Sequence, residues 1–175
     1  MSGHSKWAQI KHKKGTEDEK RGKLFSKLSM TISIAARDGS DPNANPKLRA
    51  AVEKAKASQM PNENIERAIK RVAEAKENLE EIMLEAYGPE GVAIFIEAFT
   101  DNRNRLVAEV KSALNEYGAK LGEPGSVRWA FEKEGDGMKA KYTQGLSEES
   151  KSKLNELVEV LEDRDDVRRV WTNAI

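Results

Sequence analysis

The residues of this sequence whose types and spacing could do chemistry are mostly basic, and many of them lie near the N-terminus. Lysines there are interleaved with one tryptophan and one histidine, in the set Lys6, Trp7, Lys11, His12, Lys13 and Lys14. Lysines neutralise phosphates, and an aromatic ring can stack on an exposed base. The segment therefore predicts contact with a nucleic acid, and a Trp7 packed into the core among solvated lysines is the alternative.

Further basic residues continue this pattern onto two predicted helices. They are Lys20, Arg21 and Lys23 in one helix, and Arg67, Lys70 and Arg71 in the other. The last three recur at i, i+3 and i+4, so they share one helix face. That face could bind phosphates, or it could be an ordinary solvated surface.

A weaker candidate for anion contact stands at the start of another predicted helix. Asn102, Arg103 and Arg105 follow Asp101 there, and the free backbone N–H groups of a helix N-terminus can hold an anion. Capping of the helix explains Asp101 without any ligand, so both interpretations stay open.

No motif of catalytic or metal chemistry accompanies these residues. The chain has no cysteine, and its two histidines, His4 and His12, have no partners at metal-ligand spacing. It also has no glycine-rich phosphate loop, nucleophile elbow or H-E-x-x-H sequence. We therefore predict no enzyme, no catalytic residue, no metal, no cofactor and no small-molecule substrate.

Charge is balanced over the 175 residues, with 30 basic and 30 acidic side chains, but it is uneven along the chain. Residues 1–76 hold 17 Lys and Arg against nine Asp and Glu, a net charge of +8, and residues 77–175 carry −8. This asymmetry predicts one half that faces a polyanion and one with another task. No apolar run approaches the roughly 18–20 residues that cross a bilayer, and no secretory signal is evident. We expect a cytoplasmic protein without membrane contact.

The basic residues must be positioned by the first of two folded parts. The predicted domains are a basic tail (1–15), a three-helix bundle (16–78) and a ferredoxin-like α+β domain (79–175). In the bundle, Leu24, Leu28 and Ile32 form a core-facing stripe of a first helix that Thr16 would cap. Asn45 and Pro46 have the residue types of an N-cap and first position of a second helix.

The second half changes to strand patterns. We predict strands at 92–99, 126–131, 138–142 and 167–171, with helices after the first and third of them. The order β-α-β-β-α-β fits a ferredoxin-like sheet with two helices on one face. Because the strand at 92–99 is apolar on both faces, its second face needs a cover, which we expect from the tail or the bundle.

Six stretches in a fixed order carry a family resemblance. They are GHSKW with IKHK (residues 3–13), DPNANP (41–46), MPNENIERAI (60–69), YGP (87–89), TDNRNR (100–105), and LG with GSV (121–127). Together they resemble the YebC family of probable transcriptional regulators, which is related to the mitochondrial translational activator of cytochrome oxidase subunit one.

The resemblance implies a nucleic-acid-associated regulator of gene expression without catalysis. One mechanism is that of a ribosome-associated translation factor. Its basic half contacts ribosomal RNA, and it assists the translation of sequences that are difficult for the ribosome, such as runs of proline. The alternative is a DNA-binding transcriptional regulator on duplex DNA, and a second alternative is a protein-interaction module with a basic tether. The basic residues are scattered over a tail and two helices without a helix-turn-helix pattern, which slightly favours RNA.

One departure from the family concerns a third domain. Family members insert it after the segment that matches Phe131, Glu132 and Lys133. Here only Gly135-Asp136-Gly137 stands before the next strand, so we expect a short form in which the hairpin closes directly.

Overall fold

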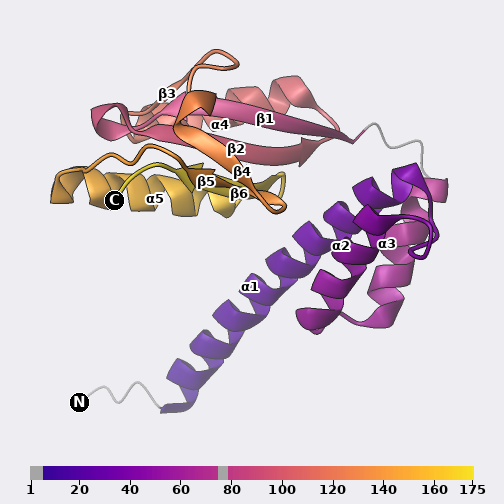
Figure 1. Ribbon diagram of the computed structural model, residues 1–175. Helices are drawn as coiled ribbons and strands as arrows, with labels where there is room; N and C mark the ends of the chain where they lie inside the picture. Colours follow the sequence, from indigo (N-terminus) through magenta and orange to yellow (C-terminus); the bar gives the residue numbers. More distant parts are fainter. Residues whose placement is uncertain (1–5, 75–78) are drawn as a thin grey trace. The chain divides into compact units, whose positions relative to one another are not determined.

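The structure is a computed structural model that describes the backbone of residues 6–74 and 79–175, and the side chains of residues 16–72 and 79–175. The chain divides into two compact units, residues 1–77 and 78–175 (Figure 1). The helices are α1 (Lys6–Ala35), α2 (Pro46–Ala57), α3 (Asn62–Glu74), α4 (Arg103–Glu116) and α5 (Glu148–Glu162). The strands are β1 (Glu80–Tyr87), β2 (Ala93–Thr100), β3 (Lys120–Leu121), β4 (Phe131–Glu134), β5 (Gly137–Ala140) and β6 (Val167–Thr172).

In the helical unit the described side chains of α1 that pack with the other two helices begin at Phe25. Leu28 and Ile32 are buried there with Leu48 of α2 and Ile65 of α3. The first half of α1 extends beyond the ends of α2 and α3 (Figure 1). Leu24, predicted to face the core, is therefore 45% exposed.

The start of α1 differs from the prediction. The helix begins at Lys6, eleven residues before the expected start at residue 17, so Thr16 is an interior residue and caps nothing. No proline interrupts residues 6–16, and a single glycine inside a helix costs only about 1 kcal/mol. The predicted basic tail from Lys6 onward is thus helical backbone.

A buried asparagine joins α1 to α2. The Asn45 side chain accepts a hydrogen bond from the Leu48 N–H (3.1 Å), which confirms it as the N-cap ahead of Pro46. Its Nδ2 group donates to the carbonyl oxygens of Ala35 (2.7 Å) and Gly39 (2.8 Å). One amide therefore fixes the end of α1, the connecting loop and the start of α2.

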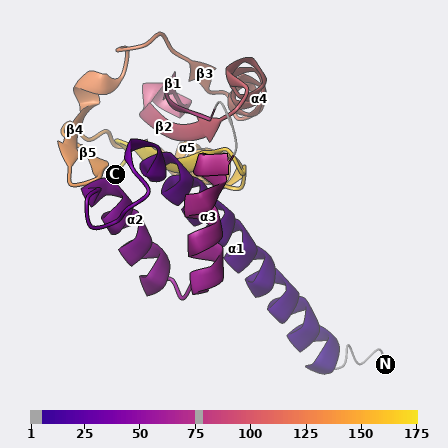
Figure 2. The ribbon, with the colours of Figure 1, turned by 90° about the vertical axis from the view of Figure 1, so that its right-hand side faces the viewer.

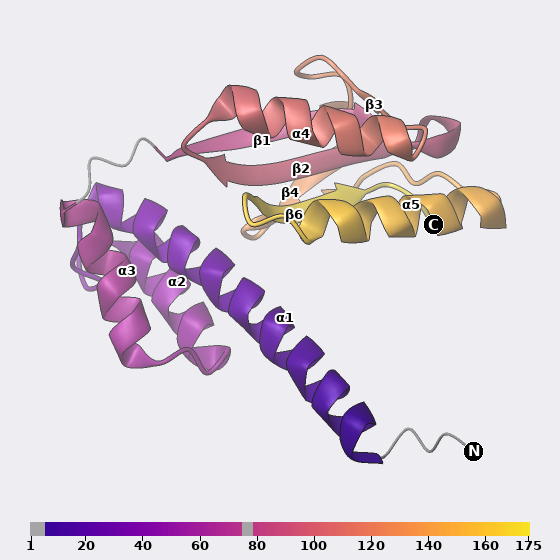
Figure 3. The same ribbon diagram turned by 180° about the vertical axis from the view of Figure 1, so that it is seen from behind.

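The second unit is built on a four-stranded antiparallel sheet in the order β3-β1-β2-β6. All eight residues of β2 are buried. On one face, Ile94 and Ile96 pack with Leu106 of α4 and Leu157 of α5, and Figure 3 shows both helices in front of this sheet. The prediction that both helices lie on one face of the sheet is thus confirmed, and the structure shows that it is the face of Ile94 and Ile96.

The opposite face is covered by a segment of the same unit. The Phe95 ring lies 5.7 Å from the ring of Phe131 and 6.3 Å from that of Trp171, measured between centroids, and Val127 is buried in the same cluster. Figure 2 shows the β4–β5 hairpin on the side of the sheet away from α4. The expectation that the tail or the bundle covers Phe95 is therefore wrong.

The predicted fold class is confirmed, because three helices are followed by an antiparallel sheet with helices on it. The strand order differs from β-α-β-β-α-β: β1 and β3 were not predicted, and β4 and β5 form a separate two-stranded sheet. This hairpin closes directly, with Glu134 opposite Gly137, as expected from the short connection.

The strand predicted at 126–131 is mostly a loop and a short 3-10 turn, Arg128–Ala130. The buried carboxylate of Glu85 on β1 explains this difference. It accepts hydrogen bonds from the N–H groups of Gly125 (2.6 Å), Val127 (2.7 Å) and Arg128 (3.0 Å). Donors that are bound to this carboxylate do not pair with a strand.

Candidate nucleic-acid interface

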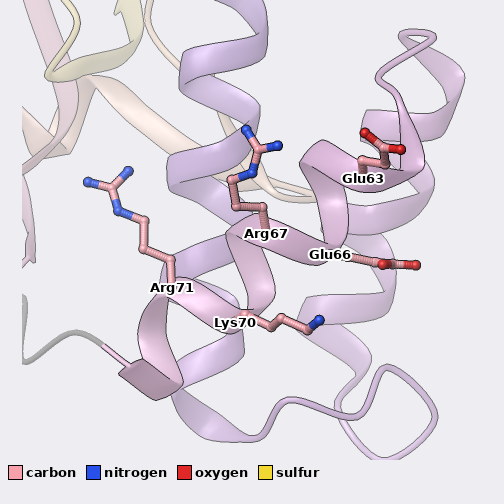
Figure 4. Close-up of a pocket in the computed structure, with 5 residues that line it drawn as sticks. All are labelled: Glu63, Glu66, Arg67, Lys70 and Arg71. Atoms are coloured by element: carbon pink, nitrogen blue, oxygen red, sulfur yellow. The ribbon is translucent and has the colours of Figure 1, made fainter.

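The basic residues predicted to share one face of α3 divide between two sides of the helix (Figure 4). Arg67, Lys70 and Arg71 line an open hollow of about 650 Å³ together with Glu63 and Glu66. Figure 4 shows Arg67 and Arg71 extending to one side of the helix, while Lys70 and Glu66 extend to the other. The two arginines thus lie apart from Lys70 and Glu66, and they also line a second hollow, between α1 and α3.

This second hollow is a shallow groove of about 290 Å³ between α1 and α3, which we call the α1–α3 groove. Its lining residues are Gly22, Phe25, Ser26 and Ser29 of α1, and Asn64, Arg67, Ala68 and Arg71 of α3. None of these described lining residues is acidic. A Cβ at Gly22 would meet no atom within 4 Å, so space is left beside the helix there.

The chemistry of the α1–α3 groove suits an anion. Two guanidinium groups offer planar sets of N–H donors that match phosphate oxygens, and they cannot lose their charge at physiological pH. Ser26, Ser29 and Asn64 add hydroxyl and amide groups that also donate hydrogen bonds. A groove lined by these donors and by no carboxylate can bind the backbone of a nucleic acid.

Sequence reasoning did not find the α1 side of this groove. Gly22, Ser26 and Ser29 recur at i, i+4 and i+7, so they form a stripe of small residues along one helix face. That spacing was a usable signal, but which helix faces the stripe is a matter of tertiary packing. The stripe forms one wall of a groove, and Arg67 on α3 contributes positive charge to the other wall.

The basic residues predicted on α1 precede Phe25, where the packing of this helix against α2 and α3 begins. Arg21 bonds to the carboxylate of Asp18 (2.7 Å), and Lys23 approaches Glu19 (3.9 Å). Such exposed pairs contribute only about 0–1 kcal/mol, so phosphate groups can compete for these cations. The six residues from Lys6 to Lys14 named above belong to α1 by their backbone, and their side chains lie outside the described residues.

The third predicted cluster, at the start of α4, faces carboxylates. The Asn102 side chain caps the helix by accepting from the Arg105 N–H (3.0 Å), so the cap is Asn102 and not Asp101. Arg105 bonds to Asp166 (3.0 Å), whose negative charge raises the pKa of Arg105, and also approaches Glu109 (3.7 Å). The structure thus gives this arginine acidic partners.

Arg103, the other cation of this cluster, lies 3.9 Å from Glu80. Both arginines at the start of α4 therefore have carboxylates within reach, and these carboxylates would repel a phosphate. For this reason we do not include this helix start in the interface proposed below.

Other kinds of site find little support in the described part of the chain. No group of three His, Cys, Asp or Glu side chains among these residues could hold a metal ion. No described helix is long and apolar enough to cross a membrane.

Comparison with known proteins assigns both units to one family. Residues 5–75 match the TACO1/YebC protein N-terminal domain, and residues 79–138 match the TACO1/YebC second and third domain. The chain belongs to the TACO1/YebC family. This assignment confirms the resemblance carried by the six sequence stretches.

Relatives in the family support the assignment over most of the chain. A probable transcriptional regulatory protein from Halothermothrix orenii is 56% identical over 138 residues, which are 77% of this chain and 54% of that protein. One from Geobacter sulfurreducens is 55% identical over 138 residues, covering 77% of this chain and 56% of that protein. The chain thus spans about half the length of these relatives.

A solved structure matches both units of the fold. The crystal structure of a conserved hypothetical protein from Aquifex aeolicus superimposes with a TM-score of 0.85 at 34% sequence identity. The match covers 98% of this chain and 97% of that one. Three helices followed by an antiparallel sheet with helices are therefore the fold of this family member.

Proposed function

We propose that this protein is a non-enzymatic regulator of gene expression that binds nucleic acid through its helical unit. The observation that carries this proposal is the α1–α3 groove, in which Arg67 and Arg71 stand beside Ser26, Ser29 and Asn64, and whose described lining residues include no carboxylate. Arginine pairs with phosphate through two parallel hydrogen bonds, which fixes the orientation of the ligand as well as its charge. The groove is thus suited to a sugar–phosphate backbone.

The part of α1 that precedes Phe25 would extend this contact. Its basic side chains, together with the aromatic and histidine residues among them, are Lys6, Trp7, Lys11, His12, Lys13, Lys14, Lys20, Arg21 and Lys23. In this proposal the lysines neutralise phosphates beyond the groove. Each such contact releases a condensed counterion, so binding weakens as the salt concentration rises.

We infer that the nucleic acid is ribosomal RNA, in keeping with a translation factor that acts at the ribosome. Two arginines of α3 line a groove beside α1, and further basic residues are distributed along α1. A major-groove reader instead presents the N-terminal residues of one recognition helix to base edges. The arrangement here supports recognition of backbone shape, which is how proteins read double-stranded segments of RNA.

A DNA-binding transcriptional regulator is the second candidate, and the names of the relatives favour it. The proteins from Halothermothrix orenii and Geobacter sulfurreducens are both described as probable transcriptional regulatory proteins. Phosphate contacts by Arg67 and Arg71 would serve a DNA duplex as well. An experiment on cell lysate is therefore needed to decide between ribosomal RNA and duplex DNA.

Sedimentation of cell lysate through a sucrose gradient separates the two candidates. The proposal predicts co-migration with ribosomal particles at low salt, and release at high salt or after nuclease treatment. Arg67→Gln/Arg71→Gln should shift the protein toward the free fractions. Lys54→Gln/Lys56→Gln removes two exposed charges from α2 and should sediment like the wild type. Absence from every ribosomal fraction at low salt would exclude the ribosome and leave DNA.

A further inference from the structure

Two aromatic rings of the α+β unit are exposed side by side. Trp129 is 58% exposed and Tyr142 is 54% exposed, although large aromatic side chains are normally mostly buried. Their ring centroids lie 6.0 Å apart with an interplanar angle of 40°. Trp171, by contrast, is partly buried in the cluster around Phe95. The exposed pair therefore does not serve the core.

Hydrogen bonds hold the Trp129 ring in place without covering its face. Its Nε1 group donates to the carbonyl oxygen of Ser126 (2.8 Å), and the hydroxyl of Tyr87 donates to the same oxygen (2.7 Å). Tyr142 is anchored through its backbone, because the N–H groups of Lys141 (2.8 Å) and Tyr142 (3.3 Å) both donate to the Ala130 carbonyl.

The loop that carries Trp129 is itself fixed from below. Glu85 holds the N–H groups of Gly125, Val127 and Arg128 through its buried carboxylate. Close packing of Gly122 against Ser126 adds to this, since a Cβ at Gly122 would lie 2.5 Å from the Ser126 hydroxyl oxygen. An aromatic surface that is ordered before binding loses little conformational entropy when a ligand arrives.

Positive charge flanks both rings. Arg128 precedes Trp129 in the chain, and the Lys141 Nζ lies 5.4 Å from the centroid of the Tyr142 ring. Both cations are exposed, and neither forms an ion pair with a residue that the structure describes. Two carboxylates of the hairpin have other partners: Glu134 pairs with Lys139, and Asp136 pairs with Arg169.

We propose that Trp129 and Tyr142 form a stacking site for an unpaired base of single-stranded RNA, with Arg128 and Lys141 on the adjacent phosphates. Exposed aromatic faces beside cations are the combination that single-stranded nucleic acids bind, since every base has a π-face and every linkage a charge. The proposal rests on the proposed nucleic-acid function, and it gives the α+β unit a part in it. The helical unit would then bind phosphates, and the α+β unit would bind unstacked bases.

The test measures the affinity of the full chain for three fluorescently labelled probes of equal length: an oligouridylate, an RNA duplex and an abasic strand. Trp129→Ala should weaken oligouridylate binding about five- to hundredfold, the loss that follows removal of one stacking ring. Affinity for the abasic strand should not change, because it has no base to stack.

Two control variants separate stacking from a general loss of structure. Trp129→Phe keeps an aromatic face and should retain most of the affinity for oligouridylate. Met83→Ala truncates another side chain that is 42% exposed on the same unit, and it should bind all probes like the wild type. Circular dichroism checks that each variant is folded.

The outcomes distinguish failure of this site from failure of the proposed function. If Trp129→Ala binds oligouridylate as tightly as the wild type, the stacking site is overturned and phosphate binding by the helical unit stands. If the wild type binds none of the probes at low salt, both proposals fall. The protein could also self-associate through these rings. If Trp129→Ala abolishes self-association and leaves the affinity for oligouridylate unchanged, the rings form a contact between copies, and the stacking site is overturned.

Discussion

In each unit of this protein, one buried polar side chain makes three hydrogen bonds to backbone groups. In the helical unit it is Asn45, and in the α+β unit it is Glu85. Asn45 both donates and accepts, and it joins groups at most ten residues away in the chain. Glu85 only accepts, and its donors lie 40 to 43 residues further along.

The two side chains differ in which parts of the chain must already be in place before they can form their hydrogen bonds. A neutral amide that links neighbouring segments can act as soon as α1 and α2 form. A buried carboxylate needs its distant donors in place, because a buried charge without hydrogen bonds is strongly unfavourable. We therefore expect the α+β unit to depend more heavily on its one polar side chain than the helical unit does.

The largest expected effect is that of Glu85→Ala. Three N–H groups lose a charged acceptor, and hydrogen bonds to charged groups contribute roughly 1.5–3 kcal/mol each. Because Gly125 and Arg128 are exposed, water can replace part of this loss, and we expect the free energy of unfolding to fall by about 3–5 kcal/mol, measured by chemical denaturation. Glu132→Ala, which removes an exposed carboxylate on β4, should change it by less than about 0.5 kcal/mol. Equal effects of the two would contradict the role of Glu85.

A smaller effect is expected for Asn45→Ala in the helical unit. Loss of an N-cap costs about 1 kcal/mol, and the carbonyls of Ala35 and Gly39 lose a donor as well. The total should be about 2–3 kcal/mol by the same measurement. Asn45→Asp keeps the capping oxygen and removes the donor, so its effect should be intermediate. If Asn45→Ala were more destabilising than Glu85→Ala, the comparison would be reversed.

The smallest effect concerns Glu90, an exposed residue of the turn between β1 and β2 whose side chain bonds to Ser147, the N-cap of α5. Its carboxylate accepts from the Ser147 hydroxyl (2.5 Å), and this hydrogen bond lowers its pKa below the ordinary value of 4.5. A lowered pKa in the folded state means that the ionised form contributes stability above pH 4.5, and that this contribution is lost as pH falls through the folded pKa. Glu90→Gln should therefore destabilise slightly at neutral pH and not in acid. A stability difference that does not depend on pH would contradict this.

The same contrast between local and distant contacts explains what could be predicted from the sequence. The N-cap Asn45 and the strands β2 and β6 were predicted correctly, because their signals lie within a few residues. β1 was missed, since its glutamates obscure the alternation of Ile82, Leu84 and Ala86. The segment at 126–131 was assigned to a strand because nothing local reveals that Glu85 binds its N–H groups.

Prediction of the candidate site has the same limit. The spacing of Arg67 and Arg71 on one helix face could be read directly from the sequence. That the two arginines meet Ser26 and Ser29 in a groove whose described lining includes no acidic residue depends on how α1 packs against α3. Exposure of the Trp129 ring likewise depends on the loop that the Glu85 hydrogen bonds hold, which no local signal reveals.

The central claim is that the α1–α3 groove binds phosphates, and the salt dependence of RNA binding tests it most directly. A plot of the logarithm of affinity against the logarithm of salt concentration should become shallower in Arg67→Gln/Arg71→Gln, by about 0.7–0.9 for each phosphate that the variant no longer binds. Lys54→Gln/Lys56→Gln carries the same change in net charge and should keep the wild-type slope. If the two double variants have the same slope, the groove does not bind phosphates and the account is contradicted.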